Sequence, residues 1–451
     1  MVLRGVKGTS MSNYMFQPEI ETMNAGDKEV LQSERLVALL LRLRQAPSAY
    51  WREKLAGVDF EAITSIRDIN MLPFTHKSDL RDTYPYGMLA IPLAETVRVH
   101  ASSGTSGKPT VVGYSRGDIE MFAECNARAL AIAGVVPGDV LHNAYGYGLF
   151  TGGLGIHYGG ELLGATVVPA SGGNTTFQLQ LLEDLGAGAL CATPSFCMLL
   201  GERAEEAGLH DRLSVRIAIL GAEPWSEGMR QKIHAVWGEG LQAVDIYGLS
   251  EVMGPGVAQE SPDSPGALQI FDDHFYPEIV DPESGDPVPD GEFGELVITT
   301  LTKQAQPVIR YRTRDITRII PEPGSDGRTF TRLARLRGRA DDMLIIRGVN
   351  VYPREIEAVL LDDPDIAAHY AIVVDRRQTL VELRIVTELA SSTADAAAVS
   401  DRLRHRLLER IRIRPILEVR PPGGIPRQEV GKAQRVYEQT DDVDPVGDAH
   451  D

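Results

Sequence analysis

The sequence predicts an α/β protein with a large N-terminal domain, in which several sheets carry flanking helices, and a small, mobile α+β domain at the C-terminus. Three observations favour this architecture. A chain of 451 residues is long enough for two or three domains of roughly 150 residues each. Between residues 96 and 320, short β-rich segments alternate with longer segments that mix polar and apolar residues. A loop rich in Pro and Gly, at 321–327, then precedes a second compact unit.

The individual elements follow in chain order. Apolar residues at helical spacing, among them Leu36, Leu39, Leu40 and Leu43, predict helices within 27–57. The β-rich segments predict strands, and the longer segments between them predict helices. The predicted strands include 97–100, 165–170, 215–220 and 296–301, and the predicted helices include 174–186 and 226–238.

The second compact unit begins at a boundary near 338–342. Pro353 suits the first turn of a helix, because its missing N–H would have no partner there. Two strands, a helix and another strand are predicted to follow, at 371–375, 380–387, 394–410 and 416–420. The predicted domains are therefore 1–340 and 341–439. The acidic stretch 440–451 is predicted to be a disordered tail.

The charge and the cysteine content exclude several classes of protein. The formal net charge is −18 at pH 7, whereas a protein that binds nucleic acid needs a positive surface. No run of ~20 apolar residues is present, so no membrane-spanning helix is expected. Cys125, Cys191 and Cys197 form no CxxC pair, and such sparse thiols fit a reducing compartment, the cytoplasm. We interpret them as small buried side chains and expect no structural zinc site.

The segment 102–109 (SSGTSGKP) is the strongest candidate for a phosphate-binding loop. Small residues let backbone N–H groups approach a phosphate, hydroxyl groups add donors, and Lys108 adds a positive charge. The spacing excludes a Walker A loop, because Gly104 and Gly107 are too close together and Pro109 follows the lysine. On its own, a stretch of this composition is more often an ordinary turn.

Three further segments offer groups for the same site. After a predicted strand, 245–251 (DIYGLSE) contains Tyr247, on which an adenine can stack, and Glu251, which can hold Mg²⁺. Asp315 is an isolated acid of the kind that accepts hydrogen bonds from ribose hydroxyls. Lys432 follows a Pro- and Gly-rich stretch, and it becomes important only if its domain folds back over the first one.

In this order the segments resemble the adenylate-forming superfamily, and in detail they are similar to bacterial phenylacetate–CoA ligases. The matching stretches are HASSGTSGKPTVVGYS (100–115), NAYGYGLFTGGLG (143–155), PASGGNT (169–175), GAEPWSE (221–227), DIYGLSEVMGPGVA (245–258), PVIRYRTRD (307–315), GRADDMLIIRGVNVYP (338–353) and IPRQEVGKAQRV (425–436). With QPEIETM (17–23), the resemblance covers nearly the whole chain. It implies an N-terminal domain that binds ATP and an acid, and a C-terminal lid that rotates about a hinge.

The resemblance also implies a role for each matched residue. The residues expected to bind ATP or AMP are Ser103, Gly104, Thr105, Ser106, Gly107, Lys108, Gly221, Ala222, Glu223, Asp245, Tyr247, Gly248, Ser250, Asp315 and Arg339. The expected catalytic residues are Lys432, which bridges the carboxylate and the α-phosphate, Glu251, which holds Mg²⁺, and Asp341, the hinge. Gly348 is expected to line the channel for CoA, the co-substrate. A homodimer is expected from the same resemblance.

The segment 143–155 offers an aromatic pocket for the acid. Tyr145, Tyr147 and Phe150 stand among glycines, which leave room while the rings supply flat apolar walls. At least one of these rings is expected to belong to the core. The resemblance favours Tyr145 and Phe150 as walls, together with Gly152 and Ile246.

Two departures from the family pattern affect these expectations. Many family members carry a Cys-rich stretch before the hinge, whereas this chain reads PEPGSDGRT at 321–329, so no zinc is expected there. Arg314 stands where the superfamily pattern has Gly, which tolerates positive φ, so the local backbone geometry is left open.

Three hypotheses for the function follow. The first is a ligase that activates phenylacetate with ATP as an acyl-adenylate and transfers the acyl group to CoA, releasing AMP and pyrophosphate. The second is a ligase for another aryl acid, an aminobenzoate or hydroxybenzoate, that loads CoA or a carrier protein in natural-product biosynthesis. The third is a catalytically silent adenylate-binding regulatory paralogue. The joint presence of Lys432, Glu251 and Asp315 argues against the third hypothesis.

Overall fold

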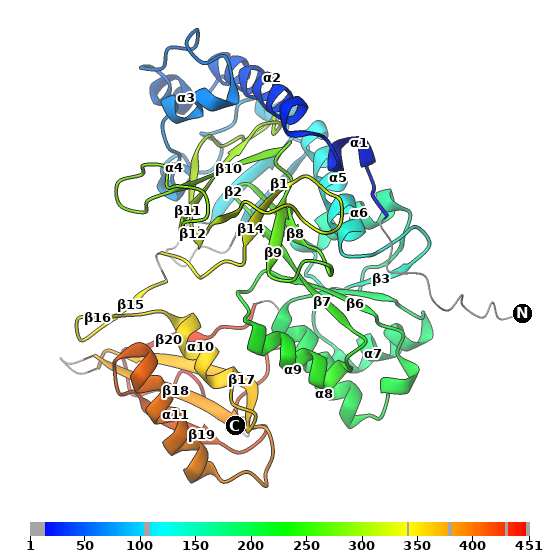
Figure 1. Ribbon diagram of the computed structural model, residues 1–451, viewed down its shortest axis with the longest axis vertical. Helices are drawn as coiled ribbons and strands as arrows, with labels where there is room; N and C mark the ends of the chain where they lie inside the picture. Colours follow the sequence, from blue (N-terminus) through cyan, green and yellow to red (C-terminus); the bar gives the residue numbers. More distant parts are fainter. Residues whose placement is uncertain (1–13, 103–108, 341, 378–380, 429–431, 448–451) are drawn as a thin grey trace, which may run out of the picture.

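The structure is a computed structural model that describes residues 14–102, 109–340, 342–377, 381–428 and 432–447. It confirms a mixed α/β fold with several sheets and an α+β unit at the C-terminus. In Figure 1, N-terminal helices lie over the sheets of the larger part, and the C-terminal unit lies below, beside helices α8 and α9.

The N-terminal helices cover one end of the larger part. They are α1 (Pro18–Glu21), α2 (Ala25–Arg44), α3 (Ala49–Lys54) and α4 (Lys77–Asp82). Helix α2 begins where the Asn24 side chain accepts a hydrogen bond of 3.0 Å from the backbone N–H of Asp27, which caps the first turn. Leu36, Leu39 and Leu43, spaced as predicted for one face of a helix, are fully buried.

A nine-stranded sheet forms the centre of the molecule, with the strand order β13-β14-β9-β8-β7-β6-β5-β3-β4. Its strands are β3 (Val140–Asn143), β4 (Thr166–Val168), β5 (Ala189–Ala192), β6 (Ile217–Gly221), β7 (Gln242–Leu249), β8 (Met253–Glu260), β9 (Ala267–Ile270), β13 (Ile319–Ile320) and β14 (Thr331–Ala334). Helix α5 (Arg116–Ile132) precedes these strands, and the helices between them are α6 (Gly152–Leu163), α7 (Thr175–Asp184), α8 (Pro194–Glu206) and α9 (Glu227–Trp237).

Two apolar clusters cover the two faces of this sheet. Along β6, Ile217 and Ile219 belong to the cluster that contains α5 and α6, while Ala218 and Leu220 belong to the cluster that contains α8 and α9. This alternation is the period of two that a strand buried on both faces requires. Strands β4, β3, β5, β6 and β7 are parallel, so their carboxyl ends meet at one edge of the sheet.

Two smaller sheets complete the larger part. A hairpin of β1 (Arg98–Ser102) and β2 (Thr110–Tyr114) flanks the predicted phosphate segment, and β10 (Phe275–Val280), β11 (Gly294–Thr300) and β12 (Tyr311–Thr317) form an antiparallel sheet. Arg314 in β12 adopts a left-handed conformation with φ of 68°, the backbone region that glycine tolerates best. Its N–H donates a hydrogen bond of 3.0 Å to Glu295, which holds the turn without a glycine.

The C-terminal unit contains a four-stranded sheet in the order β19-β18-β17-β20, preceded by a β15–β16 hairpin. Its elements are β15 (Leu344–Ile346), β16 (Val349–Val351), α10 (Pro353–Leu361), β17 (Ile366–Asp375), β18 (Glu382–Leu389), α11 (Ala396–Ile411), β19 (Ile416–Arg420) and β20 (Val436–Gln439). Helix α10 begins at Pro353 as predicted, and the order of the following elements is also as predicted.

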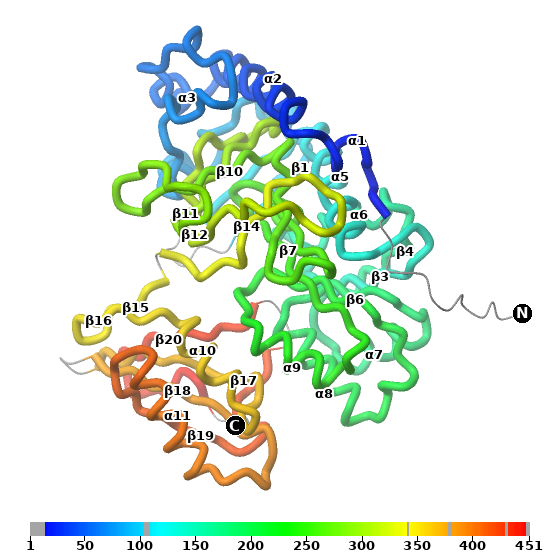
Figure 2. Tube along the Cα trace, in the orientation of Figure 1, coloured from blue at the N-terminus to red at the C-terminus, as the bar shows by residue number. Residues whose placement is uncertain are grey.

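The C-terminal unit packs against α8 and α9 through a continuous apolar cluster. Met229 and Ile233 of α9 belong to the same cluster as Ile356 and Leu360 of α10. Gly228 permits this close approach, because a Cβ there would lie 2.9 Å from the Cβ of Leu361. Figure 2 shows the C-terminal segment, in red, running between this unit and the green helices.

The acidic tail differs from its prediction. Residues 440–447 lie against the C-terminal sheet, where Val446 is buried beside Val373 and Val386, and Asp444 pairs with Arg384 at 2.6 Å. The sequence predicted disorder because the stretch is acidic and has few apolar residues. One buried valine and the arginines of the neighbouring strands supply contacts that a composition argument does not reveal.

Two smaller expectations can be compared directly with the structure. Among the described residues, no helix is long and apolar enough to cross a membrane. Cys125, Cys191 and Cys197 are all buried as free thiols, as predicted, and burial raises the pKa of each of them.

The packing of the tail yields a stability prediction. Val446→Asp should lower the stability of the C-terminal unit by about 1–3 kcal/mol, because it places an unpaired charge in an apolar cluster. The matched control is Val443→Asp, whose side chain is 70% exposed and which should change stability by less than about 0.5 kcal/mol. Thermal unfolding of both variants checks this; equal melting temperatures would show that the tail does not pack in solution.

Candidate functional site

Several of the predicted site residues that the structure describes lie at the carboxyl edge of the parallel strands. The loop with Tyr145 and Phe150 follows β3. Strand β6 ends at Gly221, and Glu223 lies just beyond it. Tyr247 lies near the end of β7, and Glu251 follows that strand. In open α/β sheets this edge is where ligands bind, because loops from several strands converge there. The sheet topology therefore brings together segments that are about 100 residues apart in the chain.

Tyr247 and Asp315 form a direct pair. The Tyr247 hydroxyl donates a hydrogen bond of 2.6 Å to Asp315 Oδ2, and both side chains are at least nine-tenths buried. Burial and the neighbouring carboxylate both raise the pKa of Tyr247. Asp315 also forms a β-bridge with Arg339, two residues before the predicted hinge. The predicted adenine-stacking and ribose-binding residues are thus joined by one hydrogen bond.

Two glycines, Gly221 at the end of β6 and Gly248 in β7, lie where a larger side chain would not fit. A Cβ at Gly221 would lie 2.4 Å from the Ile246 carbonyl oxygen, and one at Gly248 would lie 2.7 Å from that of Met253. Both positions therefore require glycine for close packing of backbones. Asp245 lies next to Ile246, and burial raises the pKa of its carboxyl group to about 6, with a further contribution from Glu260.

The two favoured pocket aromatics lie at different depths. Tyr145 is 3% exposed and its hydroxyl donates a hydrogen bond of 3.3 Å to the Ile219 carbonyl, so this ring is anchored in the core. Phe150 is half-buried at the edge. A Cβ at Gly152 would lie 2.6 Å from the Phe150 ring, so glycine there leaves space for the ring.

Lys432 reaches this edge from the C-terminal unit. Its Nζ lies 5.6 Å from the centre of the Phe150 ring. The side chain retains contact with solvent, yet desolvation by the surrounding protein lowers the pKa of its amine, while Glu223 and Glu251 act in the opposite direction. The structure therefore brings the predicted catalytic lysine to an aromatic wall and two carboxylates.

Glu223 links the two parts of the molecule. Its Oε1 accepts a hydrogen bond from the backbone N–H of Ala433, next to Lys432, and another of 2.8 Å from Ser195 Oγ. Burial raises the pKa of this carboxyl group, and these hydrogen bonds oppose the change. The sequence predicted that Glu223 lines the adenine, and the structure shows that its carboxylate also contacts the lysine-bearing segment.

Glu251 is the candidate magnesium ligand. Its carboxylate is buried, and Oε1 lies 3.1 Å from the amine of Lys77, at the start of α4. Magnesium binds oxygen atoms, often through one or two carboxylates together with phosphates and water. A buried carboxylate at this edge of the sheet is therefore a candidate ligand for such an ion.

A second acidic cluster lies away from this edge. Glu124, Asp273 and His274 bring possible ligand atoms within 4.8 Å of one another. Arg128 pairs with Asp273 at 2.8 Å inside this cluster and also contacts Glu124. A buried arginine between the carboxylates explains the cluster as an ion-pair network.

Some predicted residues are not in the part of the chain that the structure describes. These are Ser103, Gly104, Thr105, Ser106, Gly107, Lys108 and Asp341. Gly348 is described, with φ of 80°, in the turn between β15 and β16. A Cβ there would meet no atom of the described residues within 4 Å, so this turn is open in the present arrangement.

Sequence reasoning missed Ser195 and Lys77. Ser195 follows β5 in the turn Thr193-Pro194-Ser195, and Thr193 caps α8. A cap after a strand of the parallel sheet is a signal that could have placed Ser195 at the ligand edge. Lys77 gives no such signal, because its contact with Glu251 joins segments that are distant in the chain.

Together these groups can bind two anions side by side. The amine of Lys432 lies over the Phe150 ring, Glu251 is the candidate magnesium ligand, and the Tyr247–Asp315 pair is the candidate nucleoside site. This arrangement suits a carboxylic acid with an apolar body beside a nucleotide.

Comparison with known proteins identifies the same chemistry. Residues 91–302 match the family of AMP-binding enzymes, and residues 348–440 match the C-terminal domain of AMP-binding enzymes. The chain is 46% identical over 443 residues to the phenylacetate-coenzyme A ligase of Thermus thermophilus, covering 94% of this chain and 99% of that protein. It is also 46% identical over 427 residues to the phenylacetate-coenzyme A ligase of Escherichia coli, covering 93% and 96%.

Solved structures of one ligase in two states also resemble this chain. The crystal structure of 2-hydroxyisobutyryl-CoA ligase in the postadenylation state, with R3-HIB-AMP, matches with a TM-score of 0.86 and 28% identity, covering 95% of this chain and 93% of that chain. The same ligase in the thioesterification state, with 2-HIB-AMP and CoA, matches with a TM-score of 0.70 and 29% identity, covering 96% and 94%.

The relatives span almost the full length of the chain, and the two family matches fall on the central sheet and on the C-terminal unit. The chain therefore belongs to the phenylacetate–coenzyme A ligase family of the adenylate-forming superfamily.

Proposed function

We propose that this protein is an AMP-forming ligase that activates phenylacetate as phenylacetyl-adenylate and transfers the acyl group to CoA. The observation that carries the proposal is the position of Lys432, which the C-terminal unit places over the Phe150 ring, while the adjacent Ala433 donates its backbone N–H to Glu223. The names of the relatives support the choice of phenylacetate and CoA as substrates.

In the first half-reaction, a carboxylate oxygen of the acid attacks the α-phosphorus of ATP, and the bond to pyrophosphate breaks. Two anions must approach each other, and charge builds up on the α-phosphate as they react. The Lys432 amine neutralises part of this charge from a fixed position, so little reorganisation is needed. Phe150, below the amine, excludes water and receives the apolar body of the acid.

The nucleotide is bound by the edge of β6 and β7. Tyr247 supplies a ring for adenine, and its hydroxyl orients Asp315 for the ribose. The matched segment 103–108 supplies N–H groups, hydroxyls and Lys108 for the phosphates. Asp245 and Ser250 lie on either side of Tyr247. Arg339 lies beside Asp315 through their β-bridge.

Magnesium would be held by Glu251 together with phosphate oxygens. When bound, it would neutralise charge on the phosphates. Lys77 now pairs with Glu251 at 3.1 Å, so this lysine would exchange its contact for a phosphate or remain as a neighbour.

In the second half-reaction, the CoA sulfur attacks the acyl carbon and AMP leaves. We propose that residues 1–340 form the adenylation domain and 341–439 the lid, which rotates about Asp341 to bring Gly348 to the thiol channel. The higher TM-score to the postadenylation state than to the thioesterification state supports an arrangement suited to the first half-reaction. The open surroundings of Gly348 agree with this interpretation.

A homodimer and a cytoplasmic location complete the proposal. The homodimer follows from the family resemblance, whereas the cytoplasmic location follows from the sparse, buried free thiols, which fit a reducing compartment. Light scattering of the purified protein tests the dimer.

The substrate is tested by an AMP-release assay with a panel of aryl and arylacetic acids, with and without CoA. Phenylacetate together with CoA should give the highest kcat/KM. Preference for a benzoate, or for a phosphopantetheinylated carrier protein over CoA, would assign the protein to natural-product biosynthesis instead. Absence of AMP formation with every acid would support a silent paralogue.

Replacement of the lysine amine tests the mechanism. Lys432→Ala should lower the rate of ATP–pyrophosphate exchange by about 10²–10³, because a preorganised cation at the reacting phosphate is lost. Thioester formation from synthetic phenylacetyl-adenylate and CoA should change far less. An exchange rate within a few-fold of wild type would remove Lys432 from the first half-reaction.

The Tyr247–Asp315 hydrogen bond can be tested separately from ring stacking. Tyr247→Phe keeps the ring and removes the hydroxyl, so KM for ATP should rise roughly tenfold with little change in kcat, because Asp315 loses its orienting donor. Tyr247→Ala should raise KM further, since the stacking surface is also lost. Unchanged KM in the phenylalanine variant would show that Asp315 is positioned by other contacts.

A further inference from the structure

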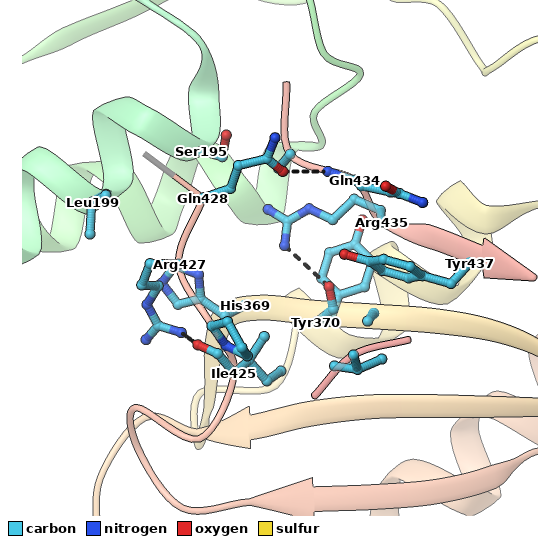
Figure 3. A pocket seen from close by; sticks show the side chains of 14 residues that line it. Ser195, Leu199, His369, Tyr370, Ile425, Arg427, Gln428, Gln434, Arg435 and Tyr437 are labelled. Carbon is cyan, nitrogen blue, oxygen red and sulfur yellow. Dashed lines mark hydrogen bonds between the residues drawn. The ribbon is translucent and has the colours of Figure 1, made fainter. Parts of the chain in front are cut away.

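Helix α8 presents one face to the C-terminal unit. Ser195, Leu199 and Glu202 are spaced four and three residues apart, which places them on the same side of the helix. Ser195 and Leu199 line a cavity of about 70 Å³ whose opposite wall is formed by the C-terminal unit. Figure 3 shows this arrangement, with His369, Arg427 and Arg435 facing the green helix.

The two ends of this face make different polar contacts. At the first end, Ser195 Oγ donates to Glu223, which in turn accepts the backbone N–H of Ala433. Two turns later, Glu202 Oε1 lies 2.8 Å from His369 Nε2 of β17, and Oε2 lies 3.8 Å from Arg427 Nε. The Ser195–Glu223 contact lies at the carboxyl edge of the sheet, where the candidate site is. The Glu202–His369 contact lies two helical turns further along α8.

Both contacts hold the segment that carries Lys432. Arg427 precedes Lys432 by five residues and Ala433 follows it directly. A hydrogen bond of 3.0 Å from the Gln434 N–H to Gln428 Oε1 ties the two flanks together. Arg427 is itself fixed by an ion pair with the buried Glu388 of β18. The segment around Lys432 is therefore connected to α8 at two places, through Glu223 and Ser195 at one end and through Arg427 and Glu202 at the other.

We propose that this face of α8 is the docking surface that positions Lys432 for adenylation, with Glu202 as a positioning residue that acts through His369 and Arg427. The inference rests on the proposed function of Lys432 and adds the residues that hold it in place. The pair Glu202–His369 joins the two parts of the molecule, so it must break if the lid rotates for the thioester step. Glu202 therefore stabilises one working arrangement and not the other.

This role has a kinetic signature that a general structural role lacks. Weakening the contacts of Glu202 with His369 and Arg427 lowers the population of the arrangement that performs adenylation. The rate of adenylation falls in proportion. Thioester formation from a preformed acyl-adenylate uses the other arrangement, so it is unchanged or faster. A residue that merely stabilised the fold would affect both half-reactions alike.

The experiment measures the two half-reactions in the full-length protein. Glu202→Gln keeps the shape of the side chain and removes its charge, and His369→Asn removes the partner. Each variant should lower ATP–pyrophosphate exchange with phenylacetate roughly tenfold. Each should leave thioester formation from synthetic phenylacetyl-adenylate and CoA at or above the wild-type rate. The double variant should lose little more exchange than either single variant, since both remove the same contact.

Glu206→Gln is the matched control. It removes the same charge from the same helix, but Glu206 pairs with Arg203 of α8 itself at 2.6 Å and should leave both rates unchanged. Equal losses in both half-reactions for Glu202→Gln, or no loss in exchange, would overturn the proposal. If the wild-type protein shows no exchange with any acid, the proposed function fails instead.

Discussion

The parallel pairing of β3, β5, β6 and β7 is the constraint on which the site depends. Parallel strands must all end at the same edge, so four loops that are far apart in the chain meet there. Gly221 and Gly248 let the backbones of β6, β7 and β8 pack closely at this edge, where Tyr247 donates a hydrogen bond to Asp315 of the neighbouring sheet. Without this parallel pairing, the residues proposed to bind the nucleotide would have no common surface.

A single sheet edge cannot supply every group that adenylation needs. The reacting acid and the phosphates are both anionic, and a permanently buried lysine beside them would incur a desolvation cost before substrates arrive. The protein places its lysine on a separate unit instead, where the side chain keeps contact with solvent. The backbone N–H of Ala433 and the carboxylate of Glu223 then fix the approach of that unit.

Much of this organisation could be predicted from local patterns. Helix α10 starts at Pro353, and this start depends on residues that are close together in the chain. The same holds for the strands and helices that follow α10 and for the buried face of α2. The contacts that assemble the site could not be predicted in this way. Glu223 and Ala433 are 210 residues apart, and Glu202 and His369 are 167 apart. No periodicity links such residues; only the sheet order and the packing of α10 on α9 bring them together. The tail at 440–447 shows the same limit, because Asp444 pairs with Arg384 and Arg420 of two preceding strands.

The continuous apolar cluster across α9 and α10 has a thermal consequence. Met229 and Ile233 of α9 are buried in one cluster with Ile356 and Leu360 of α10, and burial of apolar surface carries a large negative change in heat capacity. The hydrophobic contribution to docking therefore weakens on cooling. In the lid rotation proposed above, temperature would therefore adjust the balance between the docked and the rotated arrangement.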